Sequence, residues 1–233
     1  MIEFSQFSLG ESGPYSLSLE RGAILGLVGW RGAAATQLLE AMAGVRRHRG
    51  EVRVAGHARK AADVAYAPEE VEQILFGRTA SEAIGPLGQA FAARLGADGL
   101  LGRPPQELSS GERRRLALAA VLGSGRPLLL LDRPTAGLDP EGQELFWQAA
   151  EACTGALVMT LSHQAEAAAC TALLPVPGQG GPWPGGPMSA ERQRLLRWPP
   201  DEASDLAWTL GIRDGTRDLA EEVERWRARR RRR

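Results

Sequence analysis

The sequence predicts an α/β fold with a largely parallel core sheet, and three observations support this prediction. Short apolar runs alternate along the chain with segments of helical spacing, an order typical of a sheet covered by helices. The apolar run 23–28 leads through a glycine-containing turn into a helix, as a buried strand does. A second run, 127–131, ends at Asp132, so a strand would carry this carboxylate to its carboxyl end.

The expected elements follow one another without an internal repeat. Strands are expected at 2–7, 15–20, 23–28, 51–54, 63–66, 127–131 and 156–161. Helices are expected at 36–43, 81–100, 109–122, 141–153 and 164–171. The stretch 175–187 holds five prolines and five glycines, which suits a loop and opposes a central strand. Helical patterns then recur near 189–197, 201–210 and 217–228.

The composition is that of an ordinary globular protein, with 43% hydrophobic and 24% charged residues. The formal net charge of zero gives no general indication of nucleic-acid binding. Two cysteines form no disulfide framework, which favours a reducing cytosol. Glutamates interrupt the opening stretch, so we expect no signal peptide. No run of about 18 apolar residues occurs, so we expect any membrane association to be peripheral.

The turn between the strand at 23–28 and the following helix is a candidate phosphate-binding loop. Loop amides and a helix N-terminus both point at an anion in such a turn. The sequence from Gly29 to Thr36, GWRGAAAT, fits the pattern G-x-x-x-x-G-K-[ST] at its two ends. Ala34 and Ala35 stand in place of the second glycine and the lysine. Taken alone, the turn is explained equally well as a strand–turn–helix without a ligand.

Later segments favour the nucleotide interpretation. Residues 108–112, LSSGE, begin a helix and fit a capping box between Ser109 and Glu112, which explains their local structure but not the motifs further along the chain. A strand ending at Asp132 holds a carboxylate where phosphoryl-transfer proteins hold magnesium. A further strand leads to His163, which brings an imidazole to the same sheet edge.

Together these motifs resemble the ATPase domain of ABC transporters. They are the turn at 29–36, LSSGE, LLLLDRPTAGLDP at 128–140 and LSH at 161–163. The resemblance covers about residues 1–175. It implies a P-loop NTPase-type parallel sheet core with N-terminal antiparallel strands and a short helical subdomain at about 70–125.

A second resemblance is to the energy-coupling-factor (ECF) class of importers. Residues 71–77, VEQILFG, carry it, together with PPDE at 199–202 and LAEE at 219–222. It implies that a Pro/Gly-rich loop at 176–188 leads to a small helical C-terminal extension at 189–228. An Arg-rich tail occupies 229–233.

The ABC resemblance also implies roles for single residues. ATP would be contacted by the loop, the Q-loop, the signature segment and the D-loop: Gly29, Arg31, Gly32, Ala35, Thr36, Glu69, Ser109, Ser110, Gly111, Glu112 and Asp139. Mg²⁺ would be held by Thr36, Asp132 and Glu69. His163 matches the switch histidine, and Arg133 replaces the catalytic glutamate.

Several positions depart from the family pattern in ways that weaken this chain's own site. Ala35 removes a cation whose charge-assisted hydrogen bonds are worth roughly 1.5–3 kcal/mol each. Arg133 cannot act as a general base. Glu69 replaces a neutral amide with a carboxylate, and Leu9 stands where an aromatic ring stacks on adenine. We therefore expect binding of ATP and Mg²⁺ to be weak or absent at this site, and no hydrolysis there.

Two alternatives concern the arginines of this region. Arg31 and Arg133 could partly replace the missing cation, or Arg133 could pair with Asp132. We favour the ion pair. An ATPase that uses Arg133 in an unconventional role is a further alternative.

The signature segment retains its donors, because Ser109, Ser110 and Gly111 offer a hydroxyl and helix N-terminal amides to a γ-phosphate. We therefore predict a heterodimer in which this chain completes the active site of a second, competent ABC ATPase subunit. The resemblance implies transmembrane coupling and substrate-binding subunits, a peripheral place on the cytoplasmic face of the cell membrane, and import of a nutrient.

The alternative function is a pseudo-ATPase scaffold or regulatory subunit with no nucleotide role. Soluble ABC proteins of DNA repair or translation are disfavoured, because neither long coiled-coil insertions nor tandem ATPase domains occur. The seven arginines within 225–233 are either a solvated tail or attracted to anionic lipid, at about 1 kcal/mol per basic residue. We expect no nucleic-acid partner, because no groove-reading motif is present.

Overall fold

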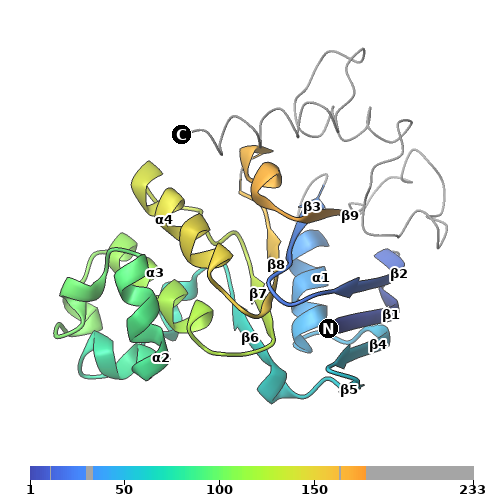
Figure 1. Cartoon of the computed structure of the whole chain (residues 1–233), viewed down its shortest axis with the longest axis horizontal. Coiled ribbons are helices and arrows are strands. Elements are labelled where there is room, and N and C mark those ends of the chain that lie inside the picture. The colour runs from blue at the N-terminus through green and yellow to red at the C-terminus, as the bar shows by residue number, and fades with distance from the viewer. Residues whose placement is uncertain (11, 30–33, 163, 177–233) are drawn as a thin grey trace, which may run out of the picture.

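The computed structural model describes residues 1–10, 12–29, 34–162 and 164–176, and within them a five-stranded parallel sheet forms the centre. Its strands are β3 (Ile24–Gly29), β6 (Val64–Ala67), β7 (Leu128–Leu131), β8 (Ala156–Thr160) and β9 (Ala172–Val176). They lie in the order β6-β7-β8-β3-β9, and every neighbouring pair is parallel (Figure 1). The predicted α/β fold with a parallel core is confirmed.

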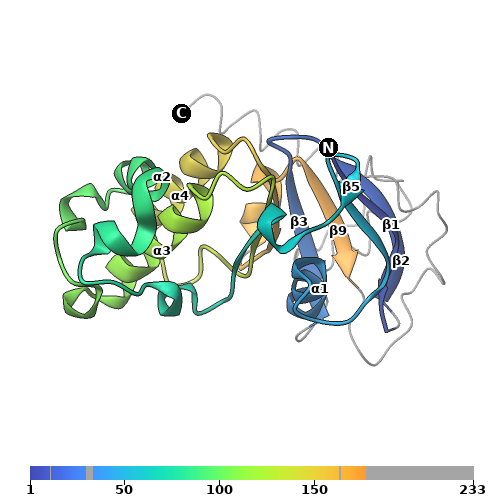
Figure 2. The same ribbon diagram turned by 90° about the horizontal axis from the view of Figure 1, so that it is seen from below.

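A second, antiparallel sheet lies beside the first and confirms the expected N-terminal strands. It contains β1 (Ile2–Leu9), β2 (Ser12–Leu19), β4 (Arg49–Val54) and the short β5 (His57–Ala58), in the order β2-β1-β4-β5. Helix α1 (Ala34–Ala43) packs between the two sheets (Figure 2). Its buried face of Leu38, Leu39 and Met42 has the spacing of an amphipathic helix.

The strands of the parallel sheet are buried on both faces. In β7, Leu128 and Leu130 join the core around α1, whereas Leu129 and Leu131 join the core on the opposite face. Successive strand residues point to opposite faces, so one run of leucines fills both cores. Helix α4 (Pro140–Glu151) supplies Phe146 to the second core.

A helical subdomain extends this second core and forms the left part of Figure 1. It contains α2 (Ala80–Arg94), α3 (Ser110–Leu122) and the short 3₁₀ helices Val71–Ile74, Asp98–Leu100 and Pro105–Glu107. A β-carbon added to Gly88 of α2 would lie 3.2 Å from the Cα of Ala120 in α3, so small residues let the two helices approach closely.

Some boundaries differ from the sequence predictions. The helix expected at 81–100 ends at Arg94, and the one expected at 164–171 is a 3₁₀ helix, Gln164–Ala169. Strands β5 and β9 were not predicted, the latter because Pro175 opposes a strand; β9 lies at the edge of the sheet, where proline is tolerated. The helices expected at 189–228, the tail at 229–233 and almost all of the loop at 176–188 lie outside the described residues.

Within the described ranges, every helix is too short or too polar to pass through a lipid bilayer.

Packing of α2 on α3 should be sensitive to Gly123, which ends α3. A β-carbon there would lie 2.5 Å from the carbonyl oxygen of Leu87, so one of the two backbones must shift. We expect Gly123→Ala to lower the unfolding free energy by about 1–3 kcal/mol in urea denaturation. The matched control is Gly99→Ala, because no atom lies within 4 Å of its added β-carbon. Equal effects of the two variants would contradict the prediction.

Candidate nucleotide site

Three strands that lead to predicted site residues end at one edge of the parallel sheet. Strands β3, β7 and β8 are parallel neighbours, so their carboxyl ends, at Gly29, Asp132 and the segment after Thr160, meet at this edge. Ligands of open α/β sheets bind at this kind of edge. Arg31, Gly32 and His163 lie outside the described residues.

Asp132 is held by groups from three different segments. Its side chain is buried, with 2% of the residue exposed, and accepts hydrogen bonds from the hydroxyls of Thr36 (3.2 Å) and Thr160 (2.5 Å). Its amide donates to the carbonyl oxygen of Ala67 (2.8 Å). A buried carboxylate needs such donors, because without them its desolvation is costly. Thr36 and Asp132 together form two oxygen donors of the kind that Mg²⁺ prefers.

The carboxylate also affects Tyr66, which lies in β6 beside the same region. Burial, and then the negative charges of Asp132 and Glu40, raise the pKa of Tyr66 to about 12. The phenol therefore stays protonated at about pH 10, where an ordinary tyrosine is half ionised.

Arg133 does not pair with Asp132, so the ion pair favoured from the sequence is wrong. Its guanidinium lies 2.6 Å from the carboxylate of Glu69, with the two side chains 46% and 50% exposed. The reason lies in the backbone: Arg133 has a left-handed φ of 45°, and its amide donates to the Thr160 hydroxyl (2.7 Å). The chain turns directly after Asp132, so the carboxylate stays inside while the guanidinium points outward to Glu69.

This pair joins two of the substituted positions of the family pattern, Glu69 and Arg133. Glu69, expected to help hold Mg²⁺, is occupied by a guanidinium, and Arg133 is in turn neutralised by Glu69. An exposed pair of this kind contributes only about 0–1 kcal/mol to stability. In this arrangement both charged side chains are directed at each other rather than at Asp132.

The lysine position of the loop is filled by an apolar side chain. Ala35 is buried in the core around α1. Lys60, the one lysine of the chain, lies instead next to β5, where its amide donates to Asp63. The described residues therefore provide no lysine at this edge of the sheet.

The signature segment forms the N-terminus of α3, as predicted. Ser109 and Glu112 form the expected capping box: the Glu112 amide donates to the Ser109 hydroxyl (3.3 Å), and the Ser109 amide donates to the Glu112 carboxylate (2.8 Å). Hydrogen bonds from the Ser109 amide and hydroxyl lower the pKa of Glu112. Ser110 is exposed, and no atom lies within 4 Å of a β-carbon added at Gly111, so this end of the helix is open to a partner.

Asp139, expected in the D-loop, caps α4 by accepting a hydrogen bond from the amide of Gly142 (2.8 Å). Residues near the D-loop are fixed by a buried carboxylate that sequence reasoning missed. Glu166 accepts hydrogen bonds from the Thr135 hydroxyl and from the amide of Ser162 (2.6 Å), the residue before His163. A buried glutamate within an alanine-rich segment gives no sequence signal for this connection.

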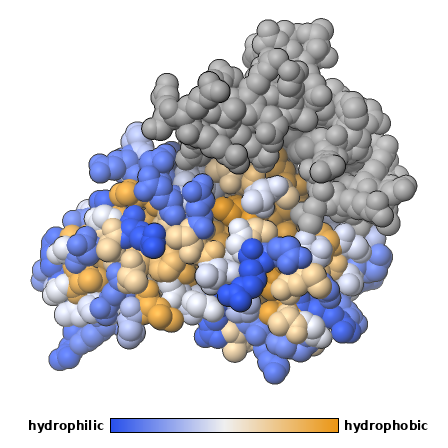
Figure 3. Space-filling model, viewed as in Figure 1, coloured by the Kyte–Doolittle hydropathy of each residue, from blue (hydrophilic) through white to orange (hydrophobic). Residues whose placement is uncertain are grey.

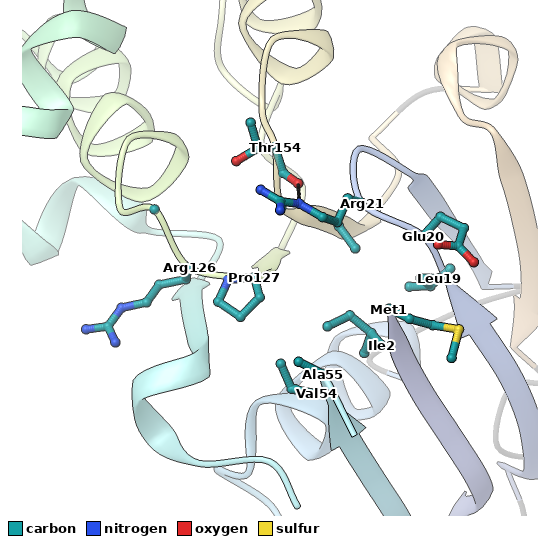
Figure 4. Close-up of a pocket in the computed structure, with 13 residues that line it drawn as sticks. Met1, Ile2, Leu19, Glu20, Arg21, Val54, Ala55, Arg126, Pro127 and Thr154 are labelled. Atoms are coloured by element: carbon teal, nitrogen blue, oxygen red, sulfur yellow. Dashed lines mark hydrogen bonds between the residues drawn. The ribbon is translucent and has the colours of Figure 1, made fainter. Parts of the chain in front are cut away.

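Two further observations delimit the site. Within the described ranges, no cluster of three or more His, Cys, Asp or Glu side chains could hold a metal ion, so Thr36 and Asp132 would need oxygen ligands from elsewhere. A cavity of about 250 Å³ lies at the opposite edge of the sheet, among the segments that lead into β7 and β8 (Figure 4). Arg21 lines it and donates to the carbonyl oxygen of Thr154 (3.4 Å).

Comparison with known proteins gives the family. The model of the family described as ABC transporter matches residues 13–136. A putative ABC transporter ATP-binding protein of Streptomyces avermitilis is 36% identical over 66% of this chain, and the hemin import ATP-binding protein HmuV of Streptomyces coelicolor is 37% identical over 55%. The cytochrome c biogenesis ATP-binding export protein CcmA of Novosphingobium aromaticivorans is 34% identical over 64%. The chain spans 31%, 54% and 78% of these relatives.

The fold is also that of a solved ABC structure. The structure of cbiO1 from Clostridium perfringens, part of the ABC transporter complex cbiONQ, superposes with a TM-score of 0.65 at 15% identity. The superposition covers 96% of this chain and 97% of the other. The family model covers more than half of the chain, and the solved structure shares its fold, so the chain belongs to the family of ABC transporter ATP-binding domains.

Proposed function

We propose that this chain is the ATP-binding subunit of an ABC importer whose own nucleotide site is inactive and whose signature segment completes the site of a competent partner subunit. One observation carries the proposal: the positive charge and the water-activating group are replaced at one end of the domain, while the signature helix keeps an open N-terminus.

The proposed inactivity of this chain's own nucleotide site rests on the residues at the sheet edge around Asp132. ABC ATPase domains bind ATP and Mg²⁺, and phosphoryl transfer requires cations placed against the phosphates and a group that positions water. Thr36 and Asp132 keep the metal-facing hydroxyl and carboxylate. Ala35 provides no cation, and the Arg133–Glu69 pair provides neither a base nor a free charge. We therefore assign weak binding, and no hydrolysis, to this site.

The proposed contribution to a partner's site rests on the signature segment. A helix N-terminus attracts anions through its free amides and the helix dipole. Ser110 and Gly111 stand at the start of α3, with the capping box fixing the preceding residue. We assign these residues, with Asp139, to a γ-phosphate bound on the other subunit of a head-to-tail pair.

The direction of transport and the membrane partner are part of the same proposal. HmuV is an import protein and CcmA an export protein, so the relatives leave the direction open. The ECF resemblance of residues 71–77 favours import, with the chain peripheral on the cytoplasmic face of the membrane. We further propose that residues 1–175 form the ATPase domain, followed by the Pro/Gly-rich loop, the helical extension and the tail.

Restoring the missing lysine should strengthen nucleotide binding. We expect Ala35→Lys to raise the affinity for Mg-ATP at least about tenfold in isothermal titration of the full chain, since one charge-assisted hydrogen bond is worth roughly 1.5–3 kcal/mol. Gln37→Lys is the matched control, because it adds the same charge outside the loop. Micromolar, magnesium-dependent binding by the unmodified chain would refute the weak site, as would equal affinities of the two variants.

Ser110 should matter to the complex even though this chain's own site is inactive. In the complex purified with its ATPase partner, we expect Ser110→Ala to lower the ATP hydrolysis rate about tenfold, because a hydrogen bond to a charged phosphate is lost. Ser18→Ala, at an exposed position of β2, should leave the rate unchanged. An unaffected rate would favour a scaffold without a nucleotide role, and a complex holding only a homodimer would also exclude the proposal.

Contact with the membrane subunit is assigned to the segment around Phe76, which is 80% exposed although it is aromatic. Hydrophobic and hydrophilic side chains are interspersed over the helical part at the left of Figure 3. We expect Phe76→Asp to reduce recovery of the membrane subunit with the tagged chain, because an exposed aromatic ring often anchors an interface. Val45→Asp removes a comparably exposed side chain, 69% exposed, outside the subdomain and should not reduce it. Equal recovery of both variants would contradict this assignment.

A further inference from the structure

Arg114 is the most deeply buried arginine of the signature helix, with 7% of the residue exposed. Three arginines follow one another here, but Arg113 and Arg115 are only partly buried. A buried guanidinium needs acceptors for its donors, because unpaired burial of a charge is costly. The acceptors of Arg114 must therefore come from the elements packed around it.

These acceptors belong to two other segments of the domain. Nη1 donates to the carbonyl oxygen of Glu69 (2.7 Å) and to the carboxylate of Glu72 (3.3 Å), which lie before and within the 3₁₀ helix Val71–Ile74. Nη2 and Nε donate to the carbonyl oxygens of Arg133 (2.8 Å) and Pro134 (3.4 Å), directly after β7. We refer to these five residues as the Arg114 cluster.

The Arg114 cluster joins the same two positions that the Glu69–Arg133 ion pair joins, but from the inside. The ion pair links their exposed side chains, whereas Arg114 links their backbones in a buried setting. A planar guanidinium holds several acceptors in fixed directions, which an ammonium cannot do. The start of the Q-loop, the turn after Asp132 and the signature helix are therefore held together by one side chain.

We infer that Arg114 is a positioning residue that couples the Q-loop to the signature helix. A displacement of residues 69–76, which carry the exposed Phe76, must move Arg114 and with it α3, whose first residue is Ser110. A continuous set of contacts through a shared element can carry coupling between two surfaces. The mechanical link rests on the described contacts alone; its consequence for a partner's ATP rests on the proposed function.

Hydrogen exchange on the full chain tests the link. We expect Arg114→Lys, which keeps the charge but loses the planar fork, to raise amide exchange about tenfold both at residues 69–76 and at 132–137, since each lost contact is worth about a factor of ten. Peptides of β3 and β8 should be unchanged. Arg115→Lys is the matched control, because no hydrogen bond of the Arg115 side chain is found within the described residues, and it should change neither segment.

Glu72→Gln removes the Arg114–Glu72 ion pair and leaves the other contacts of the Arg114 guanidinium in place. Three of its four acceptors are backbone carbonyl oxygens, which the substitution does not change. Its effect should be smaller than that of Arg114→Lys. If Arg114→Lys raised amide exchange equally throughout the sheet, the substitution would have destabilised the whole domain. If it raised exchange in only one of the segments 69–76 and 132–137, or in neither, Arg114 would not connect them. Either result overturns the inference.

A second measurement addresses the consequence. In the complex, Arg114→Lys should bring the ratio of membrane-subunit-stimulated to basal ATP hydrolysis toward one, whereas Arg115→Lys should keep the ratio. An unchanged ratio overturns the coupling role. If Ser110→Ala leaves the ATP hydrolysis rate unchanged, the proposed function fails, but the hydrogen-exchange result on Arg114→Lys still holds. The two failures are therefore distinguishable.

Discussion

The burial of one carboxylate, Asp132, constrains the whole edge of the sheet. A carboxylate taken out of water must accept hydrogen bonds, and here hydroxyls from α1 and β8 supply them through Thr36 and Thr160. The same threonine of β8 accepts the amide of Arg133 and so fixes the turn after β7. Helix α1, strand β7 and strand β8 are therefore joined at Asp132.

The opposite charges of Glu69 and Arg133 compensate each other in the structure. A lone arginine in place of a glutamate would face the buried carboxylate or the solvent, and a lone glutamate at position 69 would add negative charge to the edge that already holds Asp132. Together they neutralise each other at 2.6 Å. Because the pair is half exposed, its contribution to stability is small, about 0–1 kcal/mol. The pair does not involve Asp132, whose hydrogen bonds come from Thr36 and Thr160.

The sequence predicted the elements with strong periodicity and the residues whose role is local. The parallel core, the capping box of Ser109 and Glu112, and the carboxylate at the end of β7 were all predicted, since each depends on neighbours along the chain. The partner of Arg133 was not, because it depends on a left-handed turn and on a segment 64 residues away. Arg114 was missed for a similar reason: in a run of three arginines, nothing marks the one that faces the core.

The phosphate loop and the signature segment differ in the kind of group that each offers to a phosphate. In the family pattern a lysine side chain of the phosphate loop supplies positive charge, and Ala35 stands at that position here. The signature segment supplies hydrogen bonds from backbone amides and a hydroxyl, which depend on the start of α3 rather than on a charged residue. Arg114 holds that helix against the turn after β7, and the buried Asp132 holds the turn. Under the proposed function, the domain loses its own chemistry and still presents these donors, because the contacts that hold α3 use backbone oxygens and do not involve the side chain at position 35.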